Sequence, residues 1–206
     1  MLVKDSKFII SAARAEQWPD DDLPEIVFSG KSNVGKSSLI NALCNRKNLA
    51  YSGSAPGKTR LINFYDVNGI MRMVDLPGYG FSKASKQISR TYGKLAEQFL
   101  NQRKNIKLVI QILDIRHDPT NDDLQMIDFL NSSHLPFILS VNKCDKLSKS
   151  QGITRAGKIA RMLHIDPDTP FILTSSSTKR GIDEIWDAID FYCFDKAGHE
   201  FNATDL

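Results

Sequence analysis

The amino-acid sequence predicts an α/β fold of three layers, in which helices cover both faces of a mostly parallel six-stranded sheet with one antiparallel strand. Three observations support this prediction. Short apolar runs alternate along the chain with longer segments of helical spacing. The dipeptide Asn68-Gly69, a strong hairpin signal, joins two of the runs. A glycine-rich stretch separates the first run from the first helical segment.

Six apolar runs are the predicted strands, and most of them are expected to be buried on both faces, as parallel strands are. The runs on either side of Asn68-Gly69 are expected to pair antiparallel through that turn. The strands are predicted at residues 26–28, 61–67, 70–74, 108–113, 137–141 and 171–173.

Helices are predicted where apolar residues recur every three or four positions. One follows the glycine-rich stretch at residues 38–43, and another follows Ser85. A third is expected to follow Asn121 as its cap, and a closing helix carries the apolar stripe from Ile182 to Cys193. Trp186 lies in that stripe, so we interpret it as a core residue rather than as a platform for a ligand.

The chain of 206 residues favours one domain. Residues 24–194 are predicted to form the domain that carries the sheet. Residues 1–23 are predicted to be an arm that packs on its edge, and residues 195–206 a loose tail.

The composition, with 41% hydrophobic and 25% charged residues, is that of an ordinary globular protein. No apolar run approaches the roughly 18 residues of a membrane span, and the N-terminal segment does not resemble a secretory signal. Cys44, Cys144 and Cys193 stand far apart, which fits neither a disulfide framework nor a zinc site. We interpret them as reduced thiols in a cytoplasmic protein.

The net charge of +3 is unevenly distributed. Residues 82–107 hold seven lysines and arginines and one acidic residue, and residues 143–161 hold six and one. Such segments are typical of surfaces that face RNA or phosphate groups. Solvated helix faces give the same pattern, so both interpretations stay open at this point.

The most informative motif is residues 30–37, which fit the pattern G-x-x-x-x-G-K-[ST] and are called the phosphate loop below. Its glycines allow backbone N–H groups to face an anion, and the helix start adds a positive dipole end. Lys36 supplies a charge for the β- and γ-phosphates, and the Ser37 hydroxyl is a ligand for Mg²⁺. A glycine-containing turn is the alternative. The predicted contacts are Gly30, Lys31, Ser32, Asn33, Val34, Gly35, Lys36, Ser37 and Ser38.

A second motif, Asp75-Leu76-Pro77-Gly78, follows the strand at residues 70–74. Asp75 is expected to hold Mg²⁺ through water, the Gly78 N–H to meet a terminal phosphate, and Leu76 and Pro77 to lie at the nucleotide between them. The pattern is weak alone, because aspartate and glycine also form ordinary turns. Its place after a strand and downstream of the phosphate loop favours the functional interpretation.

The motif Asn142-Lys143-Cys144-Asp145 is predicted to select the base. Guanine presents N1–H and a 2-amino group side by side, and the Asp145 carboxylate can accept both, whereas adenine would leave it unpaired. Asn142 is expected to brace the loop and to reach N7, and the Lys143 stem to lie over the base. A polar turn after a strand is the alternative.

Two further loops complete the predicted site. Backbone N–H groups of Thr174, Ser175 and Ser176 are expected to reach the guanine O6. Glycine, serine and proline between residues 46 and 60 predict a mobile loop. Within it Gly57 and Lys58 precede Thr59, which is expected to close on Mg²⁺ and the γ-phosphate and to be released after hydrolysis, so that the loop acts as a switch.

In this order the motifs resemble those of the translation-factor-related P-loop GTPases, a group of P-loop NTPases with a Ras-like G domain. In detail the chain resembles the EngB (YihA/YsxC-type) family over roughly residues 6–194. The strings that carry the resemblance are Pro56-Gly57-Lys58-Thr59, Asp75-Leu76-Pro77-Gly78-Tyr79-Gly80, and Asp114-Ile115-Arg116-His117-Asp118-Pro119-Thr120 with Asp123.

The resemblance implies Mg²⁺-dependent binding of GTP and GDP, and slow GTP hydrolysis that depends on Lys36, Thr59, Asp75 and Gly78. It also implies a role in assembling the large ribosomal subunit and an association with normal septation during cell division. It favours the interpretation of the basic segments as surfaces that face rRNA. We expect a cytoplasmic monomer.

One departure from Ras-like GTPases concerns hydrolysis. Tyr79 stands where those proteins place a water-orienting glutamine, and a phenol cannot orient and polarise a water as an amide does. We therefore predict weak intrinsic turnover unless another group helps. Asn33 resembles the asparagine that helps bind K⁺ in some related GTPases, with a plain turn residue as the alternative. Arg60 and Arg116 are candidates for stabilising charge in the reaction, but we favour the interpretation of each as a surface or structural ion partner.

Two rival functions stay open on the sequence. One is a GTP- or GDP-gated module that binds the ribosome and hydrolyses nucleotide only incidentally, which Tyr79 favours. The other is an ATPase, which the base-selecting motif disfavours.

Overall fold

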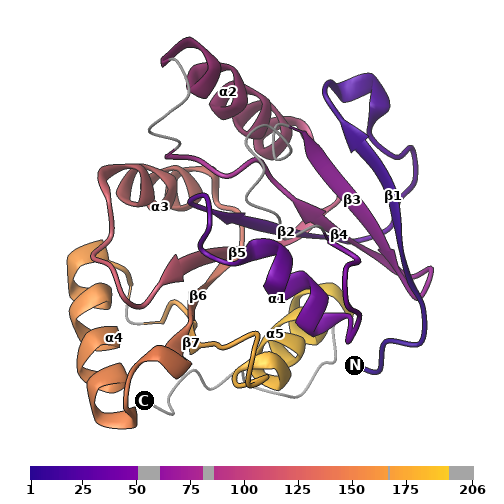
Figure 1. The fold of residues 1–206 in the computed structure, drawn as a ribbon. Coiled ribbons are helices and arrows are strands. Elements are labelled where there is room, and N and C mark those ends of the chain that lie inside the picture. The colour runs from indigo at the N-terminus through magenta and orange to yellow at the C-terminus, as the bar shows by residue number, and fades with distance from the viewer. Residues whose placement is uncertain (51–60, 81–85, 167, 195–206) are drawn as a thin grey trace.

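Seven strands form one sheet, in the order β1-β3-β4-β2-β5-β6-β7, with helices on both sides of it (Figure 1). The computed structural model describes residues 1–50, 61–80, 86–166 and 168–194. The strands are β1 (Ser6–Ala12), β2 (Glu25–Gly30), β3 (Ile62–Val67), β4 (Met71–Asp75), β5 (Ile106–Asp114), β6 (Phe137–Asn142) and β7 (Phe171–Leu173). The helices are α1 (Lys36–Leu43), α2 (Lys86–Gln102), α3 (Asn121–Ser133), α4 (Lys149–Leu163) and α5 (Ile182–Phe194), with short 3-10 turns η1 (Ala15–Gln17) and η2 (Cys144–Lys146).

The sheet is parallel except at one strand. β3 runs antiparallel to both of its neighbours, β1 and β4, and the other neighbouring strands pair in parallel. Asn68 and Gly69 adopt φ values of 55° and 68°, the left-handed conformation that a tight hairpin turn needs. The predicted α/β fold class, with a mostly parallel sheet and one antiparallel strand, is confirmed.

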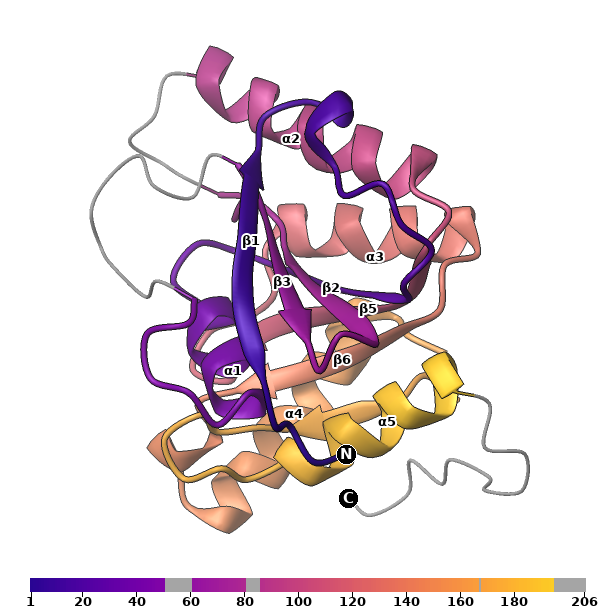
Figure 2. The ribbon, with the colours of Figure 1, turned by 90° about the vertical axis from the view of Figure 1, so that its right-hand side faces the viewer.

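The helices form two layers with separate apolar cores. Residues of α1 and α5 pack on one face of the sheet, and Trp186 is 5% exposed within that core. Residues of α2, α3 and α4 pack on the other face. Figure 2 shows the sheet nearly edge-on, with α2 and α3 above it and α1 and α5 below. Trp186 is therefore a packing residue, as predicted.

The seventh strand is β1, which lies within the segment expected to be an arm; the sequence predicted six strands. Phe8, Ile9 and Ile10 follow one another in β1, so its apolar residues do not alternate with polar ones. Phe8 and Ile9 are both exposed, and the pairing with β3 shifts between Phe8 and Ile10. A strand at the edge of a sheet needs no buried second face, so its sequence lacks the pattern that identified the other six strands.

Two helical features also differ from the prediction. Helix α4 was not predicted, since the residues it buries are Gly152, Ala156, Ile159 and Leu163, and two of these are too small to form an apolar stripe. Helix α3 begins at Asn121, and its cap is Thr120, whose side chain and backbone exchange hydrogen bonds with Asp123. Asn121 is therefore the first helical residue and not the cap.

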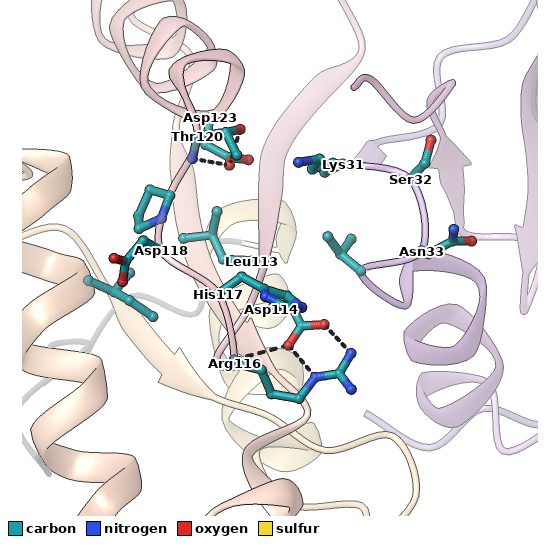
Figure 3. Close-up of a pocket in the computed structure, with 13 residues that line it drawn as sticks. Lys31, Ser32, Asn33, Leu113, Asp114, Arg116, His117, Asp118, Thr120 and Asp123 are labelled. Atoms are coloured by element: carbon teal, nitrogen blue, oxygen red, sulfur yellow. Dashed lines mark hydrogen bonds and ion pairs between the residues drawn. The ribbon is translucent and has the colours of Figure 1, made fainter. Parts of the chain in front are cut away.

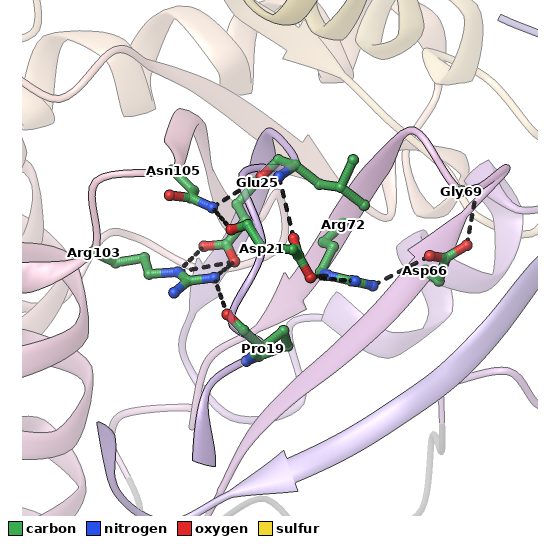
Figure 4. Close-up of polar contacts among 9 residues, drawn as sticks. Pro19, Asp21, Glu25, Asp66, Gly69, Arg72, Arg103 and Asn105 are labelled. Atoms are coloured by element: carbon green, nitrogen blue, oxygen red, sulfur yellow. Dashed lines mark hydrogen bonds and ion pairs between the residues drawn. The ribbon is translucent and has the colours of Figure 1, made fainter. Parts of the chain in front are cut away.

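A buried ionic network fixes the segment that leads into β2 (Figure 4). The Arg103 guanidinium donates to both carboxylate oxygens of Glu25 and, at 2.8 Å, to the Pro19 carbonyl. Arg72 on β4 donates to Asp21 and to Asp66. Burial raises the pKa of Glu25, and the hydrogen bonds from Arg103 oppose that rise. The network ties β2, which carries the phosphate loop, to β4 and to the chain after α2.

The carboxyl ends of the parallel strands lie along one edge of the sheet, where ligands of such folds bind. β2 ends at Gly30, β4 at Asp75, β5 at Asp114 and β6 at Asn142. Residues 174–176 follow β7 directly. Within the described ranges no helix is long and apolar enough to cross a bilayer, and Cys44, Cys144 and Cys193 form no disulfide.

Candidate nucleotide-binding site

The phosphate loop turns from the end of β2 into the start of α1. Gly35 is the residue before the helix and has a φ of 109°, which a side chain would strain. A Cβ atom at Gly35 would also lie 2.4 Å from the Asn142 Nδ2 atom. The N-terminus of α1 thus opens on Lys36 and Ser37, with unpaired N–H groups available to an anion.

Residues 142–145, called the base loop below, brace the phosphate loop from the side. The Asn142 amide donates to the Val34 carbonyl at 3.0 Å. The Lys143 ammonium donates to the Asn33 carbonyl at 2.7 Å and to Asp114 Oδ2 at 2.9 Å. The contacts to Val34 and Asn33 join the phosphate loop directly to the base loop, more than a hundred residues further along the chain.

Asp145 is held as an ionised carboxylate at the rim of the base loop. The Ser175 hydroxyl donates to its Oδ1 atom at 2.7 Å, and the Lys146 ammonium lies 2.8 Å from its Oδ2 atom. Hydrogen bonds from Lys146 and Ser175 lower the pKa of Asp145 to about 2. Ser175 is fully buried, and its hydroxyl supports the Asp145 carboxylate directly. The backbone N–H groups of Thr174 and Ser175, predicted to reach the guanine O6, instead donate to the Val141 and Arg180 carbonyls.

Lys36, Ser37 and Asp75 meet at the phosphate end of the site. The Ser37 hydroxyl donates to Asp75 Oδ2 at 3.3 Å, and the Lys36 ammonium lies 3.8 Å from Asp75 Oδ1. Asp75 is 1% exposed, and among the described residues its Oδ1 atom has no hydrogen-bond partner. Burial raises the pKa of Asp75, against the opposing effect of the Lys36 charge.

This arrangement fits Mg²⁺ and does not fit a metal held by protein side chains alone. No group of three or more His, Cys, Asp or Glu side chains that could hold a metal occurs in the part of the chain that the structure describes. Mg²⁺ takes one or two protein oxygens and fills its other positions with water and phosphate oxygens. The unpartnered Asp75 oxygen and the neighbouring Ser37 hydroxyl are such a pair.

Gly78 and Tyr79 lie directly against the phosphate loop. The Ser32 N–H donates to the Tyr79 carbonyl at 3.0 Å, and the Ser32 hydroxyl to the Gly78 carbonyl at 3.3 Å. A Cβ atom at Gly78 would lie 2.8 Å from the Ser32 Oγ atom and 3.1 Å from the Lys36 Nζ atom. A side chain at this position would therefore require Ser32 and Lys36 to shift.

A cavity of about 300 Å³ lies beside the phosphate loop (Figure 3). Residues 31–34 form one wall, and the segment between β5 and α3 forms the other. Arg116 is paired there with Asp114, which confirms its interpretation as a structural ion partner. Burial opposes ionisation of Asp114, but hydrogen bonds from Arg116 and Lys143 outweigh it and lower the pKa of Asp114.

The comparisons with known proteins agree with this geometry. Residues 25–143 match a family model described as a 50S ribosome-binding GTPase. The chain is 48% identical over 189 residues to the probable GTP-binding protein EngB of Bacillus subtilis (strain 168), which covers 92% of this chain and 97% of that protein. The chain belongs to the EngB family. It is therefore a GTP-binding protein and a GTPase, and the suspected resemblance is confirmed.

Other relatives of this EngB-family chain support the same assignment. The probable GTP-binding protein EngB of Streptococcus pneumoniae (strain Hungary19A-6) is 44% identical over 184 residues, which are 89% of this chain and 94% of that protein. A crystal structure of a probable GTP-binding protein engB superposes with a TM-score of 0.69 at 24% identity, over 84% of this chain and 100% of that chain. At that identity the superposition supports the fold alone.

The structure brings most of the predicted site residues together at one sheet edge. The phosphate loop, the segment of residues 75–78, the base loop and residues 174–176 all lie at the carboxyl ends of neighbouring strands. Gly57, Lys58, Thr59 and Arg60 lie outside the described residues, so the predicted switch threonine stays a prediction.

Sequence reasoning missed the partners of Tyr79. Its hydroxyl donates to Asp123 Oδ1 at 2.6 Å and accepts from the Gln111 amide at 2.5 Å. Gln111 lies in the middle of β5 and is fully buried, and a glutamine inside an otherwise apolar strand run was a signal that could have marked it.

Proposed function

We propose that this EngB-family chain is a Mg²⁺-dependent GTP switch that acts as a cytoplasmic monomer in assembly of the large ribosomal subunit. Its requirement for normal septation would follow from that role. The observation that supports nucleotide binding is the direct contact between the phosphate loop and the base loop, made by hydrogen bonds from Asn142 and Lys143. The description of the matching family as 50S ribosome-binding GTPases supports the ribosomal part.

Guanine selection would depend on Asp145. Its carboxylate is ionised and oriented by Ser175 and Lys146, and each of its oxygens has a second lone pair that can accept from guanine N1–H or the 2-amino group. The Asn142 side chain is committed to the Val34 carbonyl, so we assign it the bracing role first. Adenine offers no donor pair to this carboxylate, which argues against the ATPase alternative.

The phosphates would bind the N–H groups at the start of α1, with Lys36 moving from Asp75 to the β- and γ-phosphates. Ser37, Thr59 and, through water, Asp75 would hold Mg²⁺, which when bound neutralises charge on those phosphates. The Gly78 N–H would contact the terminal phosphate, because Gly78 lies beside Lys36. GTP and GDP would then differ in their contact with residues 75–78.

Hydrolysis without a partner should be slow. The Tyr79 hydroxyl is occupied by Asp123 and Gln111, so the residue that stands in the place of the water-orienting glutamine points away from an attacking water. A bound K⁺ near Asn33 or a group from the ribosome would have to supply the missing assistance. The same observation supports the alternative function, a ribosome-binding module gated by nucleotide whose hydrolysis is incidental.

The charge available for rRNA is smaller than the sequence suggests. In the segment of residues 143–161, Lys143, Lys146, Arg155 and Lys158 all form ion pairs within the chain. In the segment of residues 82–107, Arg103 is buried against Glu25. We therefore assign the rRNA contact to the exposed basic residues of these two segments that have no such pair among the described residues: Lys94, Lys104, Lys107, Lys149 and Arg161.

Single-turnover GTP hydrolysis tests the proposal. We expect hydrolysis to accelerate when large-subunit particles are added, and the protein to sediment with the particles in the presence of a non-hydrolysable GTP analogue but not GDP. Sedimentation that depends on nucleotide without any acceleration would favour the gated module. Equal rates in KCl and NaCl would remove K⁺ from the mechanism. If ADP displaced bound GDP in a competition titration, that result would contradict the guanine assignment.

A further inference from the structure

The side chain of Tyr79 is anchored between two elements that no nucleotide motif includes. Its hydroxyl donates to Asp123 Oδ1 on α3 at 2.6 Å. The same oxygen accepts a hydrogen bond from the Gln111 amide on β5 at 2.5 Å. Burial raises the pKa of Tyr79 and the nearby Asp123 charge raises it further, so the hydroxyl keeps its proton and remains a donor.

Asp123 is itself rigidly held. It is 4% exposed, and its second oxygen, Oδ2, accepts hydrogen bonds from the Thr120 N–H at 2.8 Å and from the Thr120 hydroxyl at 2.7 Å. These contacts form the capping box at the start of α3. The side chain therefore cannot follow Tyr79 if Tyr79 moves, and the phenol is attached to a fixed point of the scaffold.

The backbone of the same residue holds the other end of the connection. The Tyr79 carbonyl accepts from the Ser32 N–H at 3.0 Å, and Lys31 and Tyr79 form an isolated parallel bridge. Gly78, which precedes Tyr79, lies beside Lys36 at the phosphate end of the site. The position of Gly78 is thus set from one side by the phosphate loop and from the other by the anchored phenol.

We propose that Asp123 and Gln111 are positioning residues that hold Gly78 ready for a terminal phosphate by anchoring the phenol of Tyr79, and that this anchor raises the affinity for GTP relative to that for GDP. The inference rests on the proposed function, since it uses the assignment of Gly78 to the γ-phosphate. None of the three side chains is a catalytic residue, because each acts through the position of the Gly78 N–H.

The physical reason is preorganisation. A Gly78 N–H that already points into the site needs no ordering when the γ-phosphate arrives, so GTP binding does not bear that entropic cost. Without the anchor the segment must be ordered by the nucleotide, and Asp123 and Gln111 lose the partner of their buried polar atoms. GDP has no phosphate that reaches Gly78, so its affinity depends much less on the anchor.

The test is a pair of affinities measured by titration of the full chain with Mg²⁺ present, one for GDP and one for a non-hydrolysable GTP analogue. Tyr79→Phe removes only the hydroxyl. We expect it to weaken binding of the GTP analogue by about tenfold, because the nucleotide must then order the segment, and to leave GDP affinity within about twofold. Gln111→Met, which cannot donate, should shift the ratio of the two affinities in the same direction.

Combining the two substitutions distinguishes an anchor from two unrelated defects. In the Tyr79→Phe/Gln111→Met variant the shift in the ratio should be smaller than the sum of the single shifts, because both remove the same connection. Tyr192→Phe on α5, a half-buried phenol remote from the site, is the matched control and should change neither affinity. Thermal unfolding of each variant verifies that it is folded.

One result overturns the inference: an unchanged ratio of the two affinities in Tyr79→Phe, whether both affinities keep their values or fall by the same factor. Failure of the proposed function is recognised separately, because the unmodified protein would then bind neither GDP nor the GTP analogue.

Discussion

The carboxylate of Asp145 combines three properties that base selection needs. It is ionised, its orientation is fixed by Ser175 and Lys146, and it stands at the rim of the base loop. Such a carboxylate would discriminate between bases mainly by the free-energy cost of staying unpaired when the base offers no donor, because that cost exceeds the gain from a good hydrogen bond. Two predictions at the scale of single residues follow from this.

Asp145→Asn should reverse the base preference. The substitution replaces two acceptors with one acceptor and one donor, so GDP affinity should fall by at least about tenfold. Xanthosine diphosphate, which carries a carbonyl in place of the 2-amino group, should gain relative to GDP. Competition of both nucleotides against a fluorescent GDP measures the change. Asp22→Asn, at an exposed aspartate, is the control and should have no effect. An unchanged preference for GDP would contradict the assignment.

The preference for guanine should not depend on pH over the range in which most proteins are studied. Because the pKa of Asp145 is lowered to about 2, the carboxylate stays ionised as the pH falls from neutral to about 4. The ratio of affinities for GDP and IDP, which lacks the 2-amino group, reports this contact alone. We expect a constant ratio in titrations over that range. A ratio that collapses with a midpoint above about pH 5 would show that Asp145 is not the selecting group.

Spacing was enough to single out the phosphate loop, residues 75–78 and the base loop, which lie together at one edge of the sheet, because each is a short contiguous segment; their contacts with a nucleotide stay predictions. The anchor of Tyr79 could not be predicted in the same way. Tyr79 and Asp123 are 44 positions apart, and although Asp123 belongs to a string that carries the family resemblance, nothing around it in the sequence marks it as a partner of Tyr79. Only the fold, which brings the start of α3 next to the segment that follows β4, places the two groups in contact.

At the scale of elements, Gly35 is the point where the phosphate loop, α1 and the base loop meet. Its φ of 109° and its closeness to Asn142 each require a glycine. The start of α1 and the strand end of β6 are therefore coupled, and a side chain here would disturb both at once.

Gly35→Ala should break the hydrogen bond from Asn142 to the Val34 carbonyl. We expect a loss of stability of about 1–3 kcal/mol and a parallel loss of GDP affinity, measured by urea unfolding and by nucleotide titration. The matched control is Gly157→Ala in α4, where a Cβ would meet no atom within 4 Å. That variant should gain about 0.5–1 kcal/mol without any change in binding. Wild-type GDP affinity in Gly35→Ala would refute the coupling.

The elements that the sequence did not reveal share a physical cause. β1 covers the edge of the sheet without burying a second face, and α4 buries two small residues where other helices bury large ones. The positions of β1 and α4 are set by the elements they pack against, and the periodicity of apolar residues in the sequence does not reveal those tertiary contacts. The six predicted strands all have a buried face, which is why their apolar pattern was sufficient.

At the scale of the whole molecule, the network around Glu25 and Arg103 fixes the first residue of β2 (Figure 4). The phosphate loop follows the other end of the same strand. The Glu25 side chain is 0% exposed and the Arg103 side chain 13%. A pair so deeply buried adds little net stability, yet removal of one member leaves the other charge without a partner.

Arg103→Leu should therefore destabilise the protein by about 3–5 kcal/mol in urea unfolding. The double variant Glu25→Leu/Arg103→Leu should recover a large part of that loss, because it removes both charges. Arg14→Leu, at an arginine whose side chain is 74% exposed, should cost less than about 1 kcal/mol and serves as the control. If the double variant were as unstable as the single one, the unpaired Glu25 charge would not be the cause.

The family match begins at residue 25, and that boundary would be a poor place to cut the chain for crystallisation. A shortened protein starting there would lose β1. It would also lose the hydrogen-bond acceptors of Arg103 and Arg72 at Pro19 and Asp21. β3 would then present a bare row of N–H and C=O groups to neighbouring molecules, which is a template for intermolecular stacking of strands. Light scattering should show that such a fragment aggregates at concentrations at which the intact chain does not.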